Sequence, residues 1–241
     1  MPRNQSIIYQ LKLIITCEHG GNKIPTPYLH LFKANKELLE THRGFDLGAL
    51  DVFEYLKPIS NYSKSSTTSR LLIELNRSLQ NSQLFSEYSK TLNLSKKEHI
   101  IKANYLPYRN DIELIISNFI SKGETVLHLS IHSFTPTLNG IKRDCDIGLL
   151  YDPKICSEKQ VSVGLKSQIK TGNPQLRVRF NYPYLGKSDG FTTHLRRKFK
   201  QNYIGIEIEI NQKHSKSNQM NVVLKSALLA AIKNVIINLQ Q

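Results

Sequence analysis

Three polar side chains suited to metal binding or acid–base chemistry stand at the ends of apolar runs. His19 follows LIIT, His132 closes TVLHLSIH, and Glu209 lies near the end of YIGIEIEI. The ends of strands in an open α/β sheet converge on one crevice. Zinc in hydrolases takes three histidine or carboxylate ligands and keeps a fourth position for water, whose proton a separate carboxylate accepts. Two histidines, one or more carboxylates and an arginine such as Arg77, which ends RLLIELNR and suits an anionic substrate, are together the parts of a zinc hydrolase.

The same residue types also have ordinary structural interpretations. A histidine at a strand end is often a hydrogen-bonded loop residue, and Glu207 with Glu209 would form a solvated acidic face on an edge strand. Arg70 and Arg77 could pair with surface carboxylates. Cys17 is either a nucleophile or a buried, inert thiol, and we favour the inert thiol. The sequence contains no HExxH, Walker loop or GxSxG motif that would decide the chemistry alone.

The apolar pattern predicts strands that alternate with helices. Helical spacing covers 46–56, 111–121 and 219–239, with Asp111 as the N-cap of the second helix. Short apolar runs predict buried strands at 12–16, 70–75, 125–131, 146–151, 176–180 and 203–210. This alternation predicts a three-layer α/β/α sandwich around a central mixed, mostly parallel sheet. We expect residues 1–241 to form a single domain.

Three polar segments are expected outside the sheet. The serine-rich segment 60–69 reads as a mobile loop, and 80–98 as a surface helix or an excursion over the site. The glycine- and proline-punctuated segment 181–194 is expected to form a loop over the pocket. These segments would influence which substrate the site accepts, but their composition does not identify that substrate.

Composition limits the partners of the chain. The formal net charge is +14, from 33 Lys and Arg against 19 Asp and Glu. The basic residues are spread along the chain without a dense tract, a zinc-finger spacing or an RNP-like motif, so we expect a solvated basic surface rather than nucleic-acid binding. We expect no signal peptide and no membrane span, because no apolar run comes near the ~20 residues that a span needs. Three cysteines without CxxC suit a reducing cytoplasm. The oligomeric state stays open.

Seven segments follow one another in the order of a known family. They are CEHGGNKIP (17–25), HRGFDLGA (42–49), SRLLIELNRS (69–78), LSIHSFTP (129–136), DIGLLYD (146–152), NYPYLGKSDGFTTH (181–194) and GIEIEINQ (205–212). Together they resemble the N-formylglutamate amidohydrolase family, within the wider group of zinc carboxypeptidase-like and aspartoacylase-like hydrolases. The resemblance implies zinc-dependent cleavage of an N-acyl amino acid, with N-formyl-L-glutamate as the default substrate.

The resemblance also implies a set of metal ligands. His19 and His132 match the two histidine ligands of zinc. The third ligand is expected to be Asp46, with Glu18 as the alternative. An aspartoacylase-like pattern would place a glutamate where this chain has Asn22, which is a poor zinc ligand.

The segment ELNR resembles the DLNR segment of these hydrolases, with Glu74 in place of the aspartate. The resemblance assigns Asn76 and Arg77 to the substrate carboxylate, and a planar guanidinium suits that role. Arg77 is thereby expected to act in catalysis as well as in substrate binding. Arg70 is expected either to bind substrate or to pair with Glu74, four residues along the chain.

The resemblance places the general base on the last predicted strand. Glu209 matches the family glutamate, and Glu207 is its competitor. The expected substrate is a small molecule that bears a carboxylate. Two other functions stay open: the same chemistry on another amide, such as a short peptide or a cell-wall fragment, and a non-catalytic protein that binds acidic partners.

Overall fold

The computed structural model describes residues 10–240, and its longer strands form one six-stranded sheet. In spatial order the strands are β2 (Tyr62–Ser65), β1 (Leu11–Cys17), β3 (Thr125–Phe134), β8 (Tyr203–Asn211), β6 (Ile147–Leu150) and β7 (Val178–Phe180). Neighbouring strands are parallel except β8 and β6, which are antiparallel. The sheet is therefore mixed and mostly parallel, as predicted.

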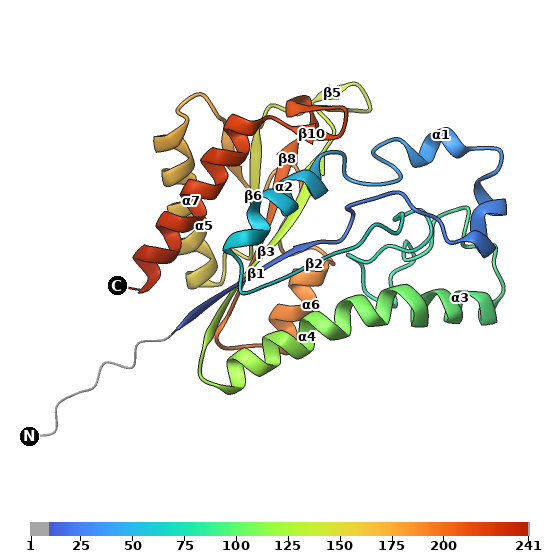
Figure 1. Ribbon diagram of the computed structural model, residues 1–241, viewed down its shortest axis with the longest axis horizontal. Helices are drawn as coiled ribbons and strands as arrows, with labels where there is room; N and C mark the ends of the chain where they lie inside the picture. The colour runs from blue at the N-terminus through green and yellow to red at the C-terminus, as the bar shows by residue number, and fades with distance from the viewer. Residues whose placement is uncertain (1–9, 241) are drawn as a thin grey trace, which may run out of the picture.

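Helices cover both faces of this sheet (Figure 1). One face carries α2 (Ala49–Leu56), α5 (Cys156–Gly172) and α7 (Val222–Gln240), and the other carries α4 (Leu106–Ser121) and α6 (Phe191–Lys198). The helix α3 (Leu94–Ile100) continues through a π-helical turn into α4. The predicted α/β/α sandwich is confirmed. Smaller elements complete the described chain: α1 (Lys36–Leu39), the 3₁₀ turns Thr26–Phe32, Lys57–Ile59 and Gln212–His214, and the hairpins β4 (Thr137–Leu138) with β5 (Ile141–Lys142) and β9 (Ser215–Lys216) with β10 (Gln219–Met220).

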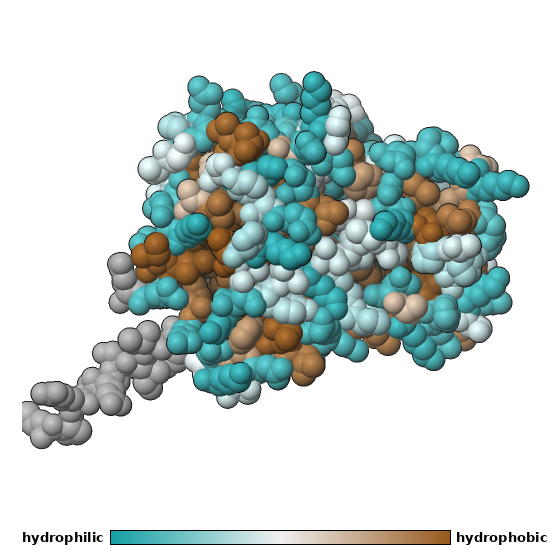
Figure 2. Space-filling view, viewed as in Figure 1, coloured by the Kyte–Doolittle hydropathy of each residue, from teal (hydrophilic) through white to brown (hydrophobic). Residues whose placement is uncertain are grey.

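The C-terminal helix α7 is more apolar than the sequence analysis expected. Among the described residues 10–240 it is the one helix with the length and composition of a membrane span. It packs against α5 and buries Leu224, Leu228 and Ile232 in the core, which accounts for much of its apolar character. Figure 2 shows apolar side chains on the visible face of the molecule in the region of this helix. Val223 and Ile237 are among the exposed apolar residues of α7.

Two predicted elements near the site are wrong. Residues 70–75 form turns instead of a strand, although Leu72 and Ile73 are fully buried. Their backbone bonds to other loops, since the Glu74 amide donates to the carbonyl of Leu84. Apolar periodicity alone does not separate a buried strand from a buried turn. The polar segment 60–69 contains the edge strand β2, paired with β1.

The start of α4 also differs from the prediction. Asp111 lies inside this helix and caps no end, because the helical path already begins at α3, where Asn93 accepts a hydrogen bond from the Lys96 amide. The apolar spacing of 111–121 marks only the part of α4 that packs against the core, so it does not show where the helix begins. The Asp111 carboxylate instead pairs with Lys64 of the edge strand β2.

One face of the sheet carries a row of buried polar side chains. His128, Ser130 and His132 alternate along β3, and Glu207 and Glu209 alternate along β8. The register places Ser130 beside Glu207 and His132 beside Glu209. This row lies on the α4–α6 face of the sheet. Alternation of polar and apolar residues along a strand usually indicates that the polar side chains face solvent, but here they are buried under the helices. The row ends at the carboxyl edge of the sheet.

Gly148 lets the segment after β7 approach Glu209. It pairs with Glu209 across β6 and β8, and a Cβ added to it would overlap the carbonyl oxygen of Tyr182. We expect Gly148→Ala to lower the free energy of unfolding by about 1–3 kcal/mol, because the backbone must shift. Chemical denaturation measures this. Gly164→Ala in α5 is the control, since its Cβ meets only ordinary contacts there; an equal effect of both substitutions would contradict the steric argument.

Candidate active site

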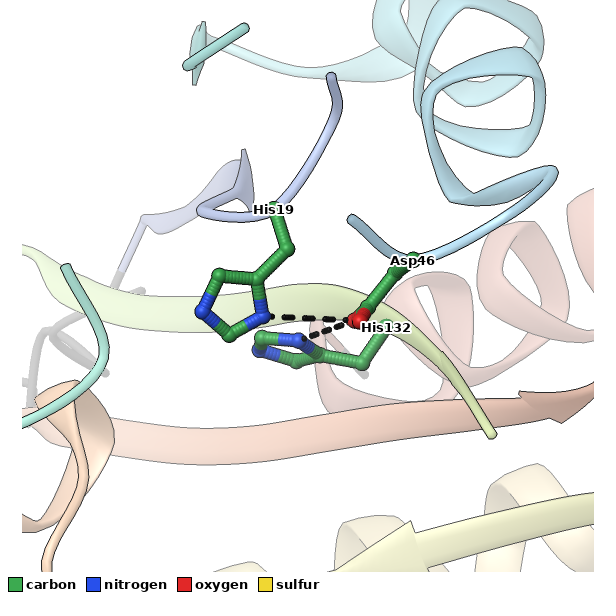
Figure 3. Close-up of side chains that lie close together, drawn as sticks. All are labelled: His19, Asp46 and His132. Carbon is green, nitrogen blue, oxygen red and sulfur yellow. Dashed lines mark hydrogen bonds and ion pairs between the residues drawn. The ribbon is translucent and has the colours of Figure 1, made fainter. Parts of the chain in front are cut away.

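Two imidazoles share one carboxylate oxygen at the carboxyl edge of the sheet (Figure 3). His19 follows β1, Asp46 precedes α2, and His132 lies on β3. The Asp46 Oδ2 atom is 3.3 Å from His19 Nδ1 and 2.9 Å from His132 Nδ1. The Asp46 amide donates to the carbonyl of His19 at 2.9 Å, which fixes the two loops relative to each other. One candidate ligand atom from each residue lies within 4.8 Å of the others.

A second layer of carboxylates holds the far nitrogen of each imidazole. Glu74 contacts Nε2 of His19 in a short hydrogen bond, and Glu18 lies 3.1 Å from Nε2 of His132. Ser130 contacts the same nitrogen of His132 at 2.9 Å. A partner of this kind fixes the ring orientation of a metal-binding histidine and directs the other nitrogen to the metal. Both rings therefore present Nδ1 to the same point.

The charges of this cluster stabilise one another. Burial raises the pKa of Asp46, but His19, His132 and Arg70 outweigh it and hold that pKa well below its usual range. Burial lowers the pKa of His132, but Asp46 and Glu18 raise it well above its usual value. Each imidazole contacts a carboxylate oxygen through both nitrogens, and a carboxylate only accepts hydrogen bonds. These carboxylates therefore favour the imidazolium form of both rings.

Arg70 is paired within the cluster and still faces the cavity. Its guanidinium binds Glu74 at 2.6 Å and Asp46 at 3.1 Å. The predicted pairing with Glu74 is therefore present, and substrate binding by Arg70 stays a prediction. Glu74 connects Arg70 and His19: its Oε2 atom binds Arg70, and its Oε1 atom binds His19. The same Oε1 atom accepts the amide of Asn76 at 3.0 Å. The longer glutamate side chain connects these three groups.

Glu18 and Cys17 lie away from the point that the two Nδ1 atoms share. The Glu18 carboxylate is fully buried beyond His132, where Ser130 donates at 2.5 Å and Tyr108 at 3.0 Å. Its position suits a residue that orients His132. Burial raises the pKa of the Cys17 thiol well above its usual value, and the neighbouring Glu18 and Asp46 carboxylates add to the shift. An un-ionised buried thiol is a poor nucleophile.

A cavity of about 170 Å³ opens beside the cluster. It is lined by His19, Asp46, Arg70, Asn76, Arg77, His132, Ser133, Tyr184 and Glu209. The preferred sequence-derived candidates for metal, substrate and base therefore border one space, whereas the alternatives Glu18 and Glu207 do not line it. Ser133 and Tyr184 were not among the candidates, and only the expectation that 181–194 covers the pocket pointed toward Tyr184.

Glu209 and Glu207 differ in their surroundings although both are buried. The Oε2 atom of Glu209 has no hydrogen-bond partner among the described residues. Burial raises the pKa of Glu209 to about 8, helped by the Asp46 and Glu207 charges. Glu207 instead accepts a hydrogen bond from Thr192 at 2.5 Å and does not line the cavity. Of the two, Glu209 is the residue that lines the cavity and has a carboxylate oxygen without a partner among the described residues.

The Asn76–Arg77 turn is fixed from two sides. The Asn76 oxygen accepts the amide of Phe191 at 2.6 Å, and the Arg77 guanidinium donates to the carbonyl of Asp189 in a short bond. Behind the turn, Arg109 is 3% exposed and donates to the carbonyl of Arg77 at 2.9 Å. Tyr105 donates to that carbonyl at 2.7 Å. Sequence reasoning missed these supports because they come from distant elements.

The remaining part of 181–194 is only partly a loop. Its last residues begin α6, where Thr192 binds Glu207 and His194 binds Glu113 at 2.8 Å. None of its threonines or histidines lines the cavity; Tyr184 does. The loop that covers the site is therefore held on α6 at one end.

Comparisons with known proteins give the family of the chain and show similar folds. The model of the N-formylglutamate amidohydrolase family matches residues 11–214. The gene product Atu2144 from Agrobacterium tumefaciens has a similar structure, with a TM-score of 0.74 at 23% sequence identity over 95% of this chain and 90% of that chain. The N-formylglutamate amidohydrolase from Ralstonia eutropha JMP134 gives a TM-score of 0.68 at 14% identity over 96% and 93%. These structures share the fold. No curated protein sequence matches the chain.

His128 makes stability depend on pH. It is fully buried between Thr16 and the hydroxyl of Tyr203, and burial lowers its pKa to about 4, below its unfolded value of 6.5. As pH falls through this window the unfolded chain binds the proton first, so stability is lost. We expect His128→Gln to make the loss of unfolding free energy between about pH 6.5 and 4.5 roughly 2 kcal/mol smaller.

Urea denaturation at a series of pH values measures this difference in slope. His30→Gln is the matched control, because His30 is exposed. A pH dependence that is identical in the parent and in His128→Gln would show that His128 takes up its proton equally in both states.

Proposed function

We propose that this chain, which belongs to the N-formylglutamate amidohydrolase family and is a hydrolase of amide bonds, is a zinc enzyme of the cytoplasm that cleaves an N-acyl amino acid. The default substrate is N-formyl-L-glutamate, and the products are formate and glutamate. The observation that carries the proposal is the convergence of His19, Asp46 and His132 beside a cavity that Glu209 and Arg77 also line.

The donor set fits zinc. Two nitrogens and one carboxylate oxygen are ligands that catalytic zinc takes, with a fourth position open. Ligand atoms 2.0–2.1 Å from a tetrahedral zinc lie about 3.4 Å apart. The separations from Asp46 Oδ2 to the two Nδ1 atoms are 3.3 and 2.9 Å, so small side-chain shifts bring them to that spacing. Glu74 and Glu18 would orient the two histidines, as carboxylates commonly do at metal sites.

The chain's own residues would bind and orient the substrate. Arg77 and Asn76 face the cavity from a turn that Arg109 and Asp189 hold, so their geometry is set before substrate arrives. The planar guanidinium of Arg77 matches the free carboxylate of an amino acid. Placing that carboxylate on Arg77 directs the amide bond toward the histidine cluster, and Arg77 also adds positive charge where the oxyanion develops.

Glu209 would manage the protons of the reaction. A zinc ion held by His19, Asp46 and His132 would act as a Lewis acid on the amide carbonyl and lower the pKa of the attacking water. Glu209 would accept the proton of that water and return it to the leaving amine. Its unpartnered Oε2 and its raised pKa, about 8, suit a group that both takes and gives a proton near neutral pH.

Zinc content tests the proposed metal site directly. We expect about one zinc per chain in protein purified without added metal, and almost none in the His19→Ala/His132→Ala double variant, because two of three ligands are removed. Atomic absorption measures the metal. The matched control is His30→Ala/His99→Ala, which removes two exposed histidines. A parent chain that holds no zinc after incubation with zinc and dialysis would overturn the proposal.

Substitution of the two strand glutamates tests the assignment of the base. We expect Glu209→Gln to lower kcat for N-formyl-L-glutamate by about 10²- to 10⁴-fold while zinc stays bound. Glu207→Gln is the matched control on the same strand, and we expect a smaller effect on kcat because Glu207 binds Thr192 outside the cavity. Steady-state kinetics with zinc analysis distinguish the two. The reverse order of effects would assign the base to Glu207.

A further inference from the structure

A second cavity lies where the chain after the Asn76–Arg77 turn meets α4 and α6. Its volume is about 260 Å³, and it shares no lining residue with the cavity beside the histidine cluster. Arg109 is the arginine on its wall, and Leu79, Leu106 and Tyr105 give it apolar surface. This space has no part in the proposed reaction, so its chemistry is open to a different ligand.

Arg109 is buried but has no acidic partner. Its exposed fraction is 3%, and no carboxylate of residues 10–240 lies within ion-pair distance of its guanidinium. Glu113, one helical turn further along α4, pairs instead with His194 at 2.8 Å and with Lys198. Asp189 accepts its hydrogen bonds from the turn beside it. Burial lowers the pKa of Arg109, and these carboxylates oppose that shift only in part. The fold therefore leaves the positive charge of Arg109 without compensation.

The guanidinium of Arg109 is held on one edge and on its flat faces. Its Nη1 atom donates to the carbonyls of Leu75 at 3.2 Å and Arg77 at 2.9 Å. Its Cζ atom lies 4.3 Å from the ring centre of Phe191 and 4.9 Å from that of Tyr105. An arginine held in this way loses little freedom when it binds a ligand.

The other edge of this guanidinium is free. Nε and Nη2 have no partner in the described part of the chain, and neither atom is enclosed by protein. Together they form the side-on fork that binds a carboxylate through two parallel hydrogen bonds. Because Arg109 lines the second cavity, this fork is open to a molecule that enters there.

The walls of the cavity favour an organic carboxylate over a phosphate. The fork supplies one positive charge, and the Glu113 carboxylate on the same wall opposes a ligand of higher negative charge, such as a phosphate group with its −1.5 to −2 near neutral pH. Leu79 and Leu106 would contact a short apolar body. We infer that Arg109 forms a second ligand site, which binds a small organic carboxylate. The inference goes beyond the proposed function and does not depend on it. A ligand there would contact the side chain that holds the carbonyl of Arg77.

Titration with butyrate tests this site through the methyl NMR signals of Leu79 and Leu106. Butyramide has the same shape without the charge. We expect both leucine signals to shift and saturate with butyrate, with a Kd at least about 10-fold lower than for butyramide, the worth of a charge-assisted hydrogen-bonded pair. The signals report on this cavity, so butyrate bound at the histidine cluster does not imitate the result.

Leu79→Glu tests the role of the fork without removing Arg109, whose loss would also release the turn that it holds. Leu79 is 43% exposed, so the fold should tolerate a carboxylate there. That carboxylate would compete with the ligand for Arg109, and we expect the Kd of butyrate, followed on Leu106, to rise about 10-fold or more. Leu94→Glu is the matched control, because Leu94 is exposed on α3 outside the cavity, and this variant should keep the parent's Kd.

Several results would overturn the inference. They are equal Kd values for butyrate and butyramide, leucine signals that do not move, or an unchanged Kd of butyrate in Leu79→Glu. Tighter binding of inorganic phosphate than of butyrate at the same signals would reject a carboxylate as the ligand. The thermal unfolding midpoint of each variant shows whether the fold is intact. The measurement uses neither zinc nor turnover, so its outcome is separate from that of the proposed function.

Discussion

The site depends on the Asp46 carboxylate, a buried negative charge that two imidazoles and one guanidinium share. His19, His132 and Arg70 all direct a donor to it, and its exposed fraction is only 4%. Removing one partner of a buried charge leaves the rest uncompensated and costs about 3–5 kcal/mol. The cluster is thus stable only when β1, β3 and the start of α2 are all in register. The ion pairs that stabilise Asp46 thus hold His19 and His132 in the positions that the proposed metal site requires.

The loops around this cluster gain order from bonds that link them to each other. Asp189 connects the covering loop to the Asn76–Arg77 turn, accepting the Ser78 amide at 3.1 Å and the Asn81 side chain at 2.6 Å. Arg109 supports the same turn from α4. Substrate-binding groups on irregular segments are usually mobile. Here Asn76 and Arg77, the residues proposed to bind substrate, are held on both sides, so substrate would meet a largely formed site.

The sequence predicted the sheet, its flanking helices and the candidate residues better than it predicted local backbone. Strand-end logic places His132 and Glu209 correctly at the cavity, since both stand on regular strands of fixed register. It mistook 70–75 for a strand, because a buried turn has the same apolar composition. The supporting contacts of Arg109 with Arg77, Glu74 with His19 and Glu18 with His132 span 32, 55 and 114 residues of sequence. No local pattern encodes such distances.

Charge balance explains why the residues that stabilise two protons on the imidazoles would also accept the proposed divalent ion. With both rings protonated, His19 and His132 carry two positive charges against Asp46, Glu74 and Glu18, and Arg70 adds a third. Exchanging the two Nδ1 protons for one divalent cation leaves this sum unchanged. The carboxylates that stabilise the imidazolium pair would therefore compensate the metal equally well, and the exchange would release protons. Glu209 stands outside this balance, since burial favours its neutral form. It is thus the one carboxyl group of the cavity whose charge is free to change during a reaction.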